Sequence, residues 1–321
     1  MSDPKPPGAT GADPAAAEAD AATREFLGHR ELLFSMVYSM LGTVADTEDV
    51  LQETWLAWAA RAVAPEAEPI DNRRAYLVRI AVNKALARQA AVSRLRETYV
   101  GPWLPEPLAT GLLPGPAPGI GDGGGAEAVE RAESVSMALM VVLETLTSLE
   151  RAVFVLHEVF GYAHTETADI LGRSPAAVRQ LAHRARAHVQ ARRPRYRTDP
   201  QVQRQVTERF AAAVHGGDLA GLLRLLAPDV TLWADGGGKA PAAGLGPVRG
   251  RQRIGRLLAV RGSRISGGLD IRYQEVNGGP SAVLSHDGVP FAVLVVDLEP
   301  DGRLVRDIYF VTNPDKLSHL D

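Results

Sequence analysis

The 321-residue chain contains no cysteine, few aromatic residues and no long apolar run. Without cysteine it can hold no disulfide, no thiolate-bound metal and no cysteine nucleophile. No apolar stretch reaches about 18 residues, the length of a membrane-spanning helix, and the N-terminus lacks the basic and then apolar pattern of a secretion signal. These absences predict a cytoplasmic protein without membrane segments or disulfides.

Acidic residues are missing from two arginine-rich stretches, although the net charge is only −3. The first runs from about Arg73 to Arg96 and the second from about Pro175 to Arg193. Between Arg173 and Arg197 there are eight arginines and no Asp or Glu. Surface helices usually mix charges of both signs. Two acid-free basic helices therefore predict contacts with nucleic-acid phosphates.

Glycine and proline are concentrated in residues 101–125, which hold fourteen of them. That density is incompatible with a helix or a sheet, so residues 98–134 are predicted to be a linker. It joins two predicted helical domains, 25–97 and 135–196, which follow a disordered tail at 1–24. A flexible linker of this length spans about 34 Å, so it does not fix the separation of the flanking domains.

Residues 164–189 have the pattern of a helix-turn-helix. A short helix, 166–171, ends at Gly172, Ser174 is the N-cap of the next helix, and Pro175 occupies its first position. The apolar residues of that helix fall within an arc of about 100°. They are Val178, Leu181, Ala182, Ala185 and Val189.

The opposite face of this helix is predicted to enter a major groove, where Arg and Gln read guanine and adenine edges. The predicted DNA contacts are Ser174, Ala177, Arg179, Gln180, His183, Arg184 and Arg186. The alternative is an ordinary amphipathic helix with a solvated arginine face. The histidines His157, His164, His183 and His188 lack acidic or cysteine partners at ligand spacing, so no metal site is predicted.

The first basic stretch follows an acidic one. Its basic face comprises Arg73, Arg74, Lys84 and Arg88, with Asn83 able to bond a base or a phosphate. The alternative is a core helix whose arginines reach out to solvent. Upstream, Asp46, Glu48, Asp49 and Glu53 lie within two turns. They could suggest acid–base catalysis or a Mg²⁺ site, but no glycine-rich loop or histidine is near. A solvated acidic face for a basic partner is the preferred interpretation.

From Asp199 onward the pattern changes to that of an α+β domain, 199–321. Before this domain, Thr147 and Glu150 form a capping box at the start of a predicted helix, and Gly161 ends that helix. Two helices, near 202–213 and at 219–226, precede five strand-like segments. The segments are 230–234, 270–276, 282–286, 289–297 and 303–311, with turns at Asp287-Gly288 and Asp301-Gly302.

Four segments together resemble an extracytoplasmic-function (group IV) bacterial RNA polymerase sigma factor. They are DTEDVLQETWLAW, RAYLVRIAVNKALA, SLERAVFVLHEVFGY and HTETADILGRSPAAVRQLAHRARAHV, and the resemblance covers 26–92 and 136–193. YVGPWLPEPL at 99–108, DGGGK at 235–239 and NPDKL at 313–317 resemble the SigJ-like, ECF41-type subgroup. The resemblance implies two all-α sigma domains, sigma2 and sigma4, and a C-terminal SnoaL/NTF2-like cone.

The resemblance also implies partners: core RNA polymerase and promoter DNA. The acidic helix, through Asp46, Asp49, Gln52 and Glu53, would contact the clamp helices of the largest polymerase subunit. Arg73, Arg74, Asn83, Lys84 and Arg88 would hold the −10 element as single strand, and the helix-turn-helix would read the −35 element. Opening about ten base-pair steps costs roughly 14 kcal/mol, so a small domain needs the polymerase to do it.

The cone is expected to regulate in cis, without a separate anti-sigma factor, and not to be an enzyme or to hold a cofactor. Its expected regulatory contacts are Trp103, Leu104, Pro105, Asp235, Gly236, Gly237, Gly238, Lys239, Asn313, Pro314 and Asp315. DGGGK fails as a Walker motif, since no Ser or Thr follows Lys239. Retained catalysis through Asp235, Asp307, Tyr309 or His286, sensing of an unknown small ligand, and a regulator with a single helix-turn-helix remain alternatives.

Overall fold

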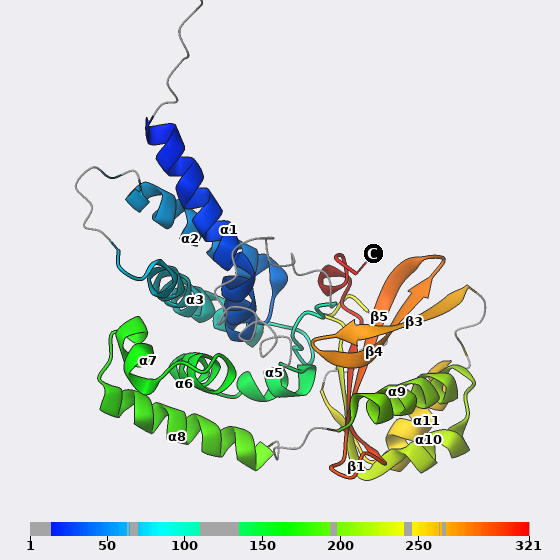
Figure 1. The fold of residues 1–321 in the computed structure, drawn as a ribbon. Coiled ribbons are helices and arrows are strands. Elements are labelled where there is room, and N and C mark those ends of the chain that lie inside the picture. Colours follow the sequence, from blue (N-terminus) through cyan, green and yellow to red (C-terminus); the bar gives the residue numbers. More distant parts are fainter. Residues whose placement is uncertain are drawn as a thin grey trace, which may run out of the picture.

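In the computed structural model, two helical units and a C-terminal α+β domain pack around an extended segment of the linker (Figure 1). The structure describes residues 14–62, 64, 70–109, 135–192, 198–240, 246–262, 264 and 268–320. Most of the linker, 110–134, and most of the loop AVAPEAEP before Arg73 lie outside the described residues, as do residues 1–13 and 193–197.

The first helical unit consists of three helices. They are α1 (Pro14–Leu41), α2 (Val44–Ala62) and α3 (Arg73–Glu97). Thr43 precedes α2, and its hydroxyl donates to Asp46 at 2.6 Å. Helix α1 begins inside the stretch expected to be a tail, since its alanine-rich start favours helix and Trp58 Nε1 donates to Ala22 O at 2.9 Å.

The second helical unit contains the helix-turn-helix. Its elements are α5 (Met137–Leu143), α6 (Ser148–Phe154), the π-helix η1 (Val155–Val159), α7 (His164–Leu171) and α8 (Pro175–Arg192). The capping box of Thr147 and Glu150 is present at the start of α6, as predicted. Gly172 takes a left-handed conformation at the end of α7, and Ser174 Oγ accepts from Ala177 N at 3.2 Å.

The two helical units share one apolar core, with α3 packed against α6 and α7. Polar contacts cross the same boundary. Arg151, 1% exposed, donates through Nε to Ser39 O at 2.9 Å, and Asn83 Nδ2 donates to Ile170 O at 3.2 Å. The units are therefore joined face to face over the described residues.

The C-terminal domain is a mixed six-stranded sheet with three helices on one face (Figure 1). The helices are α9 (Pro200–His215), α10 (Leu219–Leu225) and α11 (Arg251–Gly262), and a 3-10 turn, η2 (Pro314–Lys316), follows the last strand. The strands are β1 (Leu226–Asp235), β2 (Val248–Arg249), β3 (Leu269–Val276), β4 (Gly279–His286), β5 (Val289–Leu298) and β6 (Val305–Val311). The order is β2-β1-β6-β5-β4-β3, with β1 parallel to β6 and all other pairs antiparallel.

Successive residues of a strand point to opposite faces of a sheet, and in the central strands β4 and β5 both sets are mostly buried. Leu294 and Val296 of β5 pack toward the domain's own helices. Val293 and Val295 pack on the other side, in a cluster that contains Leu104 of the linker and Met137 of α5. We call this second side the outer face; it is the surface by which the domain meets the helical units.

Candidate nucleic-acid interface and domain contacts

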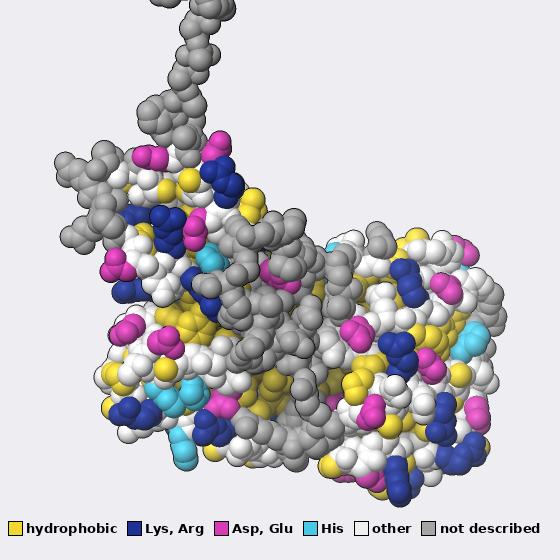
Figure 2. Space-filling view, viewed as in Figure 1, with side chains coloured by type: hydrophobic (Ala, Val, Ile, Leu, Met, Phe, Trp, Pro, Cys, Tyr) yellow, Lys and Arg dark blue, Asp and Glu magenta, His cyan; other side chains and the backbone are white. Residues whose placement is uncertain are grey.

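Helix α8 presents the predicted polar face to solvent. Arg179, Gln180, His183 and Arg184 are exposed and line one open hollow, and Figure 2 shows basic and histidine side chains gathered over α7 and α8. The residues on the opposite face, Val178, Ala182, Ala185 and Val189, are buried, with Leu181 half-buried. The fold therefore leaves the predicted reading face open.

Two arginines of α8 also hold the unit together. Arg184 Nε donates to Glu150 at 3.0 Å, and half-buried Arg186 donates to Glu158 at 2.9 Å. Arg186 is thus occupied by a contact within the unit, whereas Arg179 projects from the helix with Gln180.

Two basic residues of α3 are paired with acidic residues of α2. Arg88 Nε donates to Asp46 at 2.8 Å and its NH2 group bonds Asp49, while Lys84 Nζ lies 3.0 Å from Glu53. Residues predicted to bind DNA and residues predicted to bind polymerase thus neutralise each other. Exposed ion pairs contribute little to stability, so these side chains can exchange one another for DNA or polymerase at a small cost in free energy.

The other predicted contacts of this region have different surroundings. Arg73 forms an exposed pair with Glu25 at 3.2 Å, and Gln52 is exposed on α2. Arg74 is half-buried and interacts with Tyr162 of the second unit. Asn83 bonds Ile170 O across the same boundary. Part of the predicted −10 surface therefore lies in the contact between the two units.

Trp103 of the linker is held between two cations. The Arg96 guanidinium lies 3.5 Å from the ring centre and Lys316 Nζ 4.1 Å from it. Gly42, at φ +76°, allows the close approach, because a Cβ there would lie 2.8 Å from the ring. The half-buried tryptophan packs between α3 and the C-terminal domain, beside the end of α1.

Asp235 anchors this part of the linker to the C-terminal domain. Its fully buried carboxylate accepts from Tyr99 OH at 2.5 Å, from Leu104 N at 2.8 Å and from Lys316 Nζ at 2.7 Å. Lys316 also donates to Leu104 O. Burial lowers the pKa of Lys316 to about 8 although Asp235 opposes the shift. Two of these three bonds come from the linker, so the Asp235 carboxylate holds the linker on the C-terminal domain.

The two motifs of the C-terminal domain meet at Asp235. Its carbonyl oxygen accepts from Thr312 N at 2.7 Å and from Asn313 N at 3.0 Å. Asn313 Nδ2 donates to Tyr99 OH at 2.8 Å, and a Cβ on Gly237 would lie 2.5 Å from that amide nitrogen. Gly238 has φ +73°, Lys239 pairs with Asp315, and Pro314 begins η2.

A second anchor lies at Glu106. Its backbone N donates to Gly42 O at 2.9 Å, and its carboxylate accepts from Val44 N at 2.7 Å. His319 lies 3.1 Å from the same carboxylate and also bonds Pro107 O. Burial alone would lower the pKa of His319, but the bonds to Glu106 and Pro107 outweigh it and raise the pKa.

A buried charge cluster joins the two helical units. Glu144 of the second unit pairs with Arg96 of α3 and with Arg151 of α6, and Arg96 also donates to Leu41 O at 2.6 Å. Burial lowers the pKa of both arginines to about 9. Removing one member would leave an uncompensated buried charge, so the cluster fixes how the units are oriented.

The candidate catalytic residues of the C-terminal domain are not brought together. Asp235 is at the end of β1, whereas His286 is exposed at the end of β4, three strands away. Tyr309 is buried on the outer face, and Asp307 lies 3.6 Å from Arg306. Within the described residues no cluster of three or more potential ligands could hold a metal ion. Nor does any described helix have the length and apolarity to cross a membrane.

Sequence reasoning missed several residues of the domain contacts: Tyr38, Tyr99, Glu106, Asn277, Lys316 and His319. Tyr99, Glu106 and Lys316 lie inside the motifs that carry the family resemblance, so these motifs could have identified them. Asn277 precedes two glycines at a turn, which signals a left-handed position but not its partner.

Comparison with known proteins agrees with this arrangement. The family model "Sigma-70 region 2" matches residues 26–95 and "Sigma-70, region 4" matches residues 136–189. The ECF RNA polymerase sigma factor SigJ of Mycobacterium tuberculosis is 40% identical over 247 residues, covering 76% of this chain and 74% of the relative. The probable ECF sigma factor SigI of the same organism is 28% identical over 303 residues, 94% of this chain and 96% of the relative.

A solved structure is similar over almost the whole chain. The crystal structure of Mycobacterium tuberculosis SigJ superposes with a TM-score of 0.69 at 34% sequence identity and covers 92% of this chain and 98% of that chain. Both sigma regions and the C-terminal domain are thus found in one relative. The chain belongs to the extracytoplasmic-function sigma factors, which direct RNA polymerase to promoters.

Proposed function

We propose that this sigma factor rests in a closed state held by its own C-terminal domain and opens when core RNA polymerase and promoter DNA compete for its contacts. In the open state, α8 reads the −35 element through Arg179, Gln180, His183 and Arg184. The basic face of α3 holds the −10 element. The acidic face of α2 contacts the polymerase. The protein acts in the cytoplasm as an initiation factor and not as an enzyme.

The packing of α3 against α7 is the observation that carries the closed state. Elements named −10 and −35 lie roughly 25 base pairs apart, which is about 85 Å at about 3.4 Å per base pair. Asn83, proposed for the first element, donates to Ile170 of the helix-turn-helix at 3.2 Å. Two reading surfaces on adjacent helices do not span that distance, so the units must separate on a promoter.

The linker segment 99–109 is the proposed clasp of the closed state. It contacts the first unit at Gly42 and Val44 and the C-terminal domain at Asp235 and Asn277. Because all parts belong to one chain, weak contacts act at high effective concentration. The C-terminal domain thereby does in cis what a separate anti-sigma protein would do.

Run-off transcription with core polymerase tests the proposal. Full-length protein is compared with a chain ending at Arg197, and each is assayed for polymerase binding. We expect both to bind polymerase and the shortened chain to give more transcript per bound molecule. Equal transcript from the two chains would contradict regulation in cis. Failure of both to bind polymerase would contradict the proposed role of α2.

A further inference from the structure

The C-terminal domain encloses a large cavity that the sigma function does not use. It has a volume of about 1150 Å³ and lies between α9, α11 and the inner face of the sheet. Its walls are mainly apolar, with Phe210, Leu232, Leu258, Leu284, Leu294 and Phe310 among them. Ligand sites generally measure about 300–1,000 Å³ and combine such walls with a few polar groups. This cavity therefore has the size and lining of a small-molecule site.

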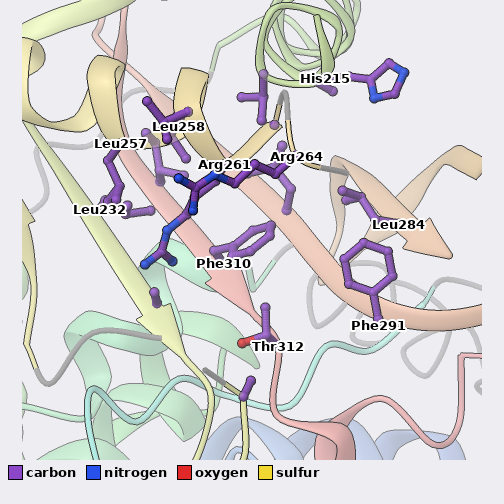
Figure 3. Close-up of a pocket in the computed structure, with 18 of the residues that line it drawn as sticks. His215, Leu232, Leu257, Leu258, Arg261, Arg264, Leu284, Phe291, Phe310 and Thr312 are labelled. Carbon is purple, nitrogen blue, oxygen red and sulfur yellow. The ribbon is translucent and has the colours of Figure 1, made fainter. Parts of the chain in front are cut away.

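The charged groups at this cavity are cationic. Helix α11 and the residues after it place the exposed side chains of Arg253, Arg256, Arg261 and Arg264 along its edge. No acidic residue is among the described residues that line it. Figure 3 shows Arg261 among the residues that line the cavity, together with Leu232, Leu257 and Phe310, so charged and apolar side chains line the same cavity.

We infer that this cavity binds an amphipathic anion, with its apolar chain between the sheet and α9 and its acidic head on the α11 arginines. Each methylene of the chain that is buried against the apolar wall raises the affinity about fourfold. The arginines favour an anionic head, since hydrogen bonds between charged groups are the stronger ones. A cationic head of the same chain length would be repelled.

The cavity shares a wall with the contacts of the linker. Thr312, Pro314 and Leu317 line it, while Thr312 N donates to Asp235 O and Leu317 packs with Leu104 on the outer face. An occupant thus touches the reverse side of the segment that holds the linker. A regulatory effect of the occupant rests on the proposed function, whereas the binding site itself does not.

Calorimetry of the full-length protein tests the site with three probes below their micelle concentrations. Decanoate carries chain and head, acetate carries the head alone, and decyltrimethylammonium carries the chain with the opposite charge. Of these three probes, we expect only decanoate to bind saturably. Octanoate, which keeps the head and lacks two methylenes, should bind about fifteenfold more weakly than decanoate. Equal binding of decanoate and decyltrimethylammonium would overturn the inference, as would no binding of decanoate.

Variants locate the site. Arg256→Gln and Arg261→Gln are each expected to weaken decanoate binding about tenfold, whereas Arg209→Gln, exposed on α9 outside the cavity, leaves it unchanged. Leu258→Trp, which narrows the apolar part of the cavity, should weaken decanoate binding, and circular dichroism checks that each variant is folded. Loss of binding in Arg209→Gln to the same degree would place decanoate elsewhere and overturn the site.

Run-off transcription with and without decanoate then separates binding from regulation. A change in transcript that is lost in Arg256→Gln supports a ligand-controlled clasp. Saturable binding without any change in transcript supports the site and contradicts its regulatory role. In that case the closed-state proposal is still decided by the shortened chain ending at Arg197.

Discussion

Asn277, in the turn between β3 and β4, donates a hydrogen bond at 2.7 Å to the hydroxyl of Tyr38, 239 residues earlier in the chain. Tyr38 in turn donates to Glu106 O of the linker, and Asn277 exchanges two bonds with Leu108. Asn277 has φ +50°, a conformation that Asn and Gly tolerate best. One side chain thus bridges the C-terminal domain, the linker and α1.

Asn277→Gly is expected to loosen the closed state and raise promoter-directed transcription. The substitution preserves the left-handed backbone but removes the amide that donates to Tyr38 OH and accepts from Leu108 N, at about 1–2 kcal/mol. Thermal unfolding and run-off transcription measure the two effects. Asp287→Gly is the matched control, since Asp287 has φ +51° in an exposed turn. Equal effects of the two substitutions would argue against a bridging role.

Trp103→Ala is expected to release the linker, because it removes the ring that lies between Arg96 and Lys316. The cation–π contacts and buried ring area are worth about 2 kcal/mol. Transcript yield should rise while the far-UV dichroism of the protein is retained. Trp103→Phe keeps a smaller ring in place and should give an intermediate yield. Unchanged transcription in Trp103→Ala would refute the clasp.

The closed state is expected to weaken as pH rises above 6.5, the ordinary pKa of histidine. The pKa of His319 is raised in the folded protein. Its stabilising contribution is therefore complete below the ordinary value of 6.5 and disappears as pH passes the raised value. Limited proteolysis of the linker across this range measures the effect, and His319→Gln removes the charge and should flatten the profile. A wild-type profile as flat as that of the variant would disprove the switch.

Arg179→Ala and Gln180→Ala should each reduce discrimination between a matched and a mutated −35 element by about 1–3 kcal/mol. Both side chains are exposed on the open face of α8. Holoenzyme binding to labelled duplexes at fixed salt provides the measurement. Arg204→Ala, an exposed arginine of α9, is the control for charge alone. If the control loses as much discrimination, α8 is not the reader.

The helix-turn-helix could be predicted almost completely from the sequence because its signals are local. The cap at Ser174, the turn at Gly172 and the buried side of α8 depend on neighbours within a few residues. The same holds for the hairpin at Asp287-Gly288, where His286 pairs with Val289. Local capping and turn chemistry left little for tertiary packing to decide.

Helix α11 and strand β2 escaped prediction because packing overrides weak local preference. Gly255 and Gly262 lower helix propensity in α11, yet both lie where a side chain would collide with a neighbouring helix. A Cβ on Gly255 would lie 3.1 Å from Leu223, and one on Gly262 would lie 1.6 Å from Val214 O. Glycines placed for close approach between helices add nothing to the apolar periodicity from which a helix is predicted.

The linker was the least predictable part. Its glycine and proline content predicted an unpacked chain, but residues 99–109 form an extended path with buried Leu104 and Glu106. Its polar groups find partners in Asp235, Gly42 and Asn277, all distant in sequence. The resemblance named Trp103, Leu104, Pro105 and Asp235 as contact residues. It did not supply the partners Gly42 and Asn277, because those bonds depend on three parts of the chain meeting.

The outer face of the sheet has a consequence for how the protein opens. Val283, Val293 and Val295 would stand bare in water if the C-terminal domain swung away from the linker and α5. An exposed apolar sheet face of that kind promotes self-association. On opening, another apolar surface must therefore cover these strands. A separately expressed C-terminal domain should form dimers or aggregates.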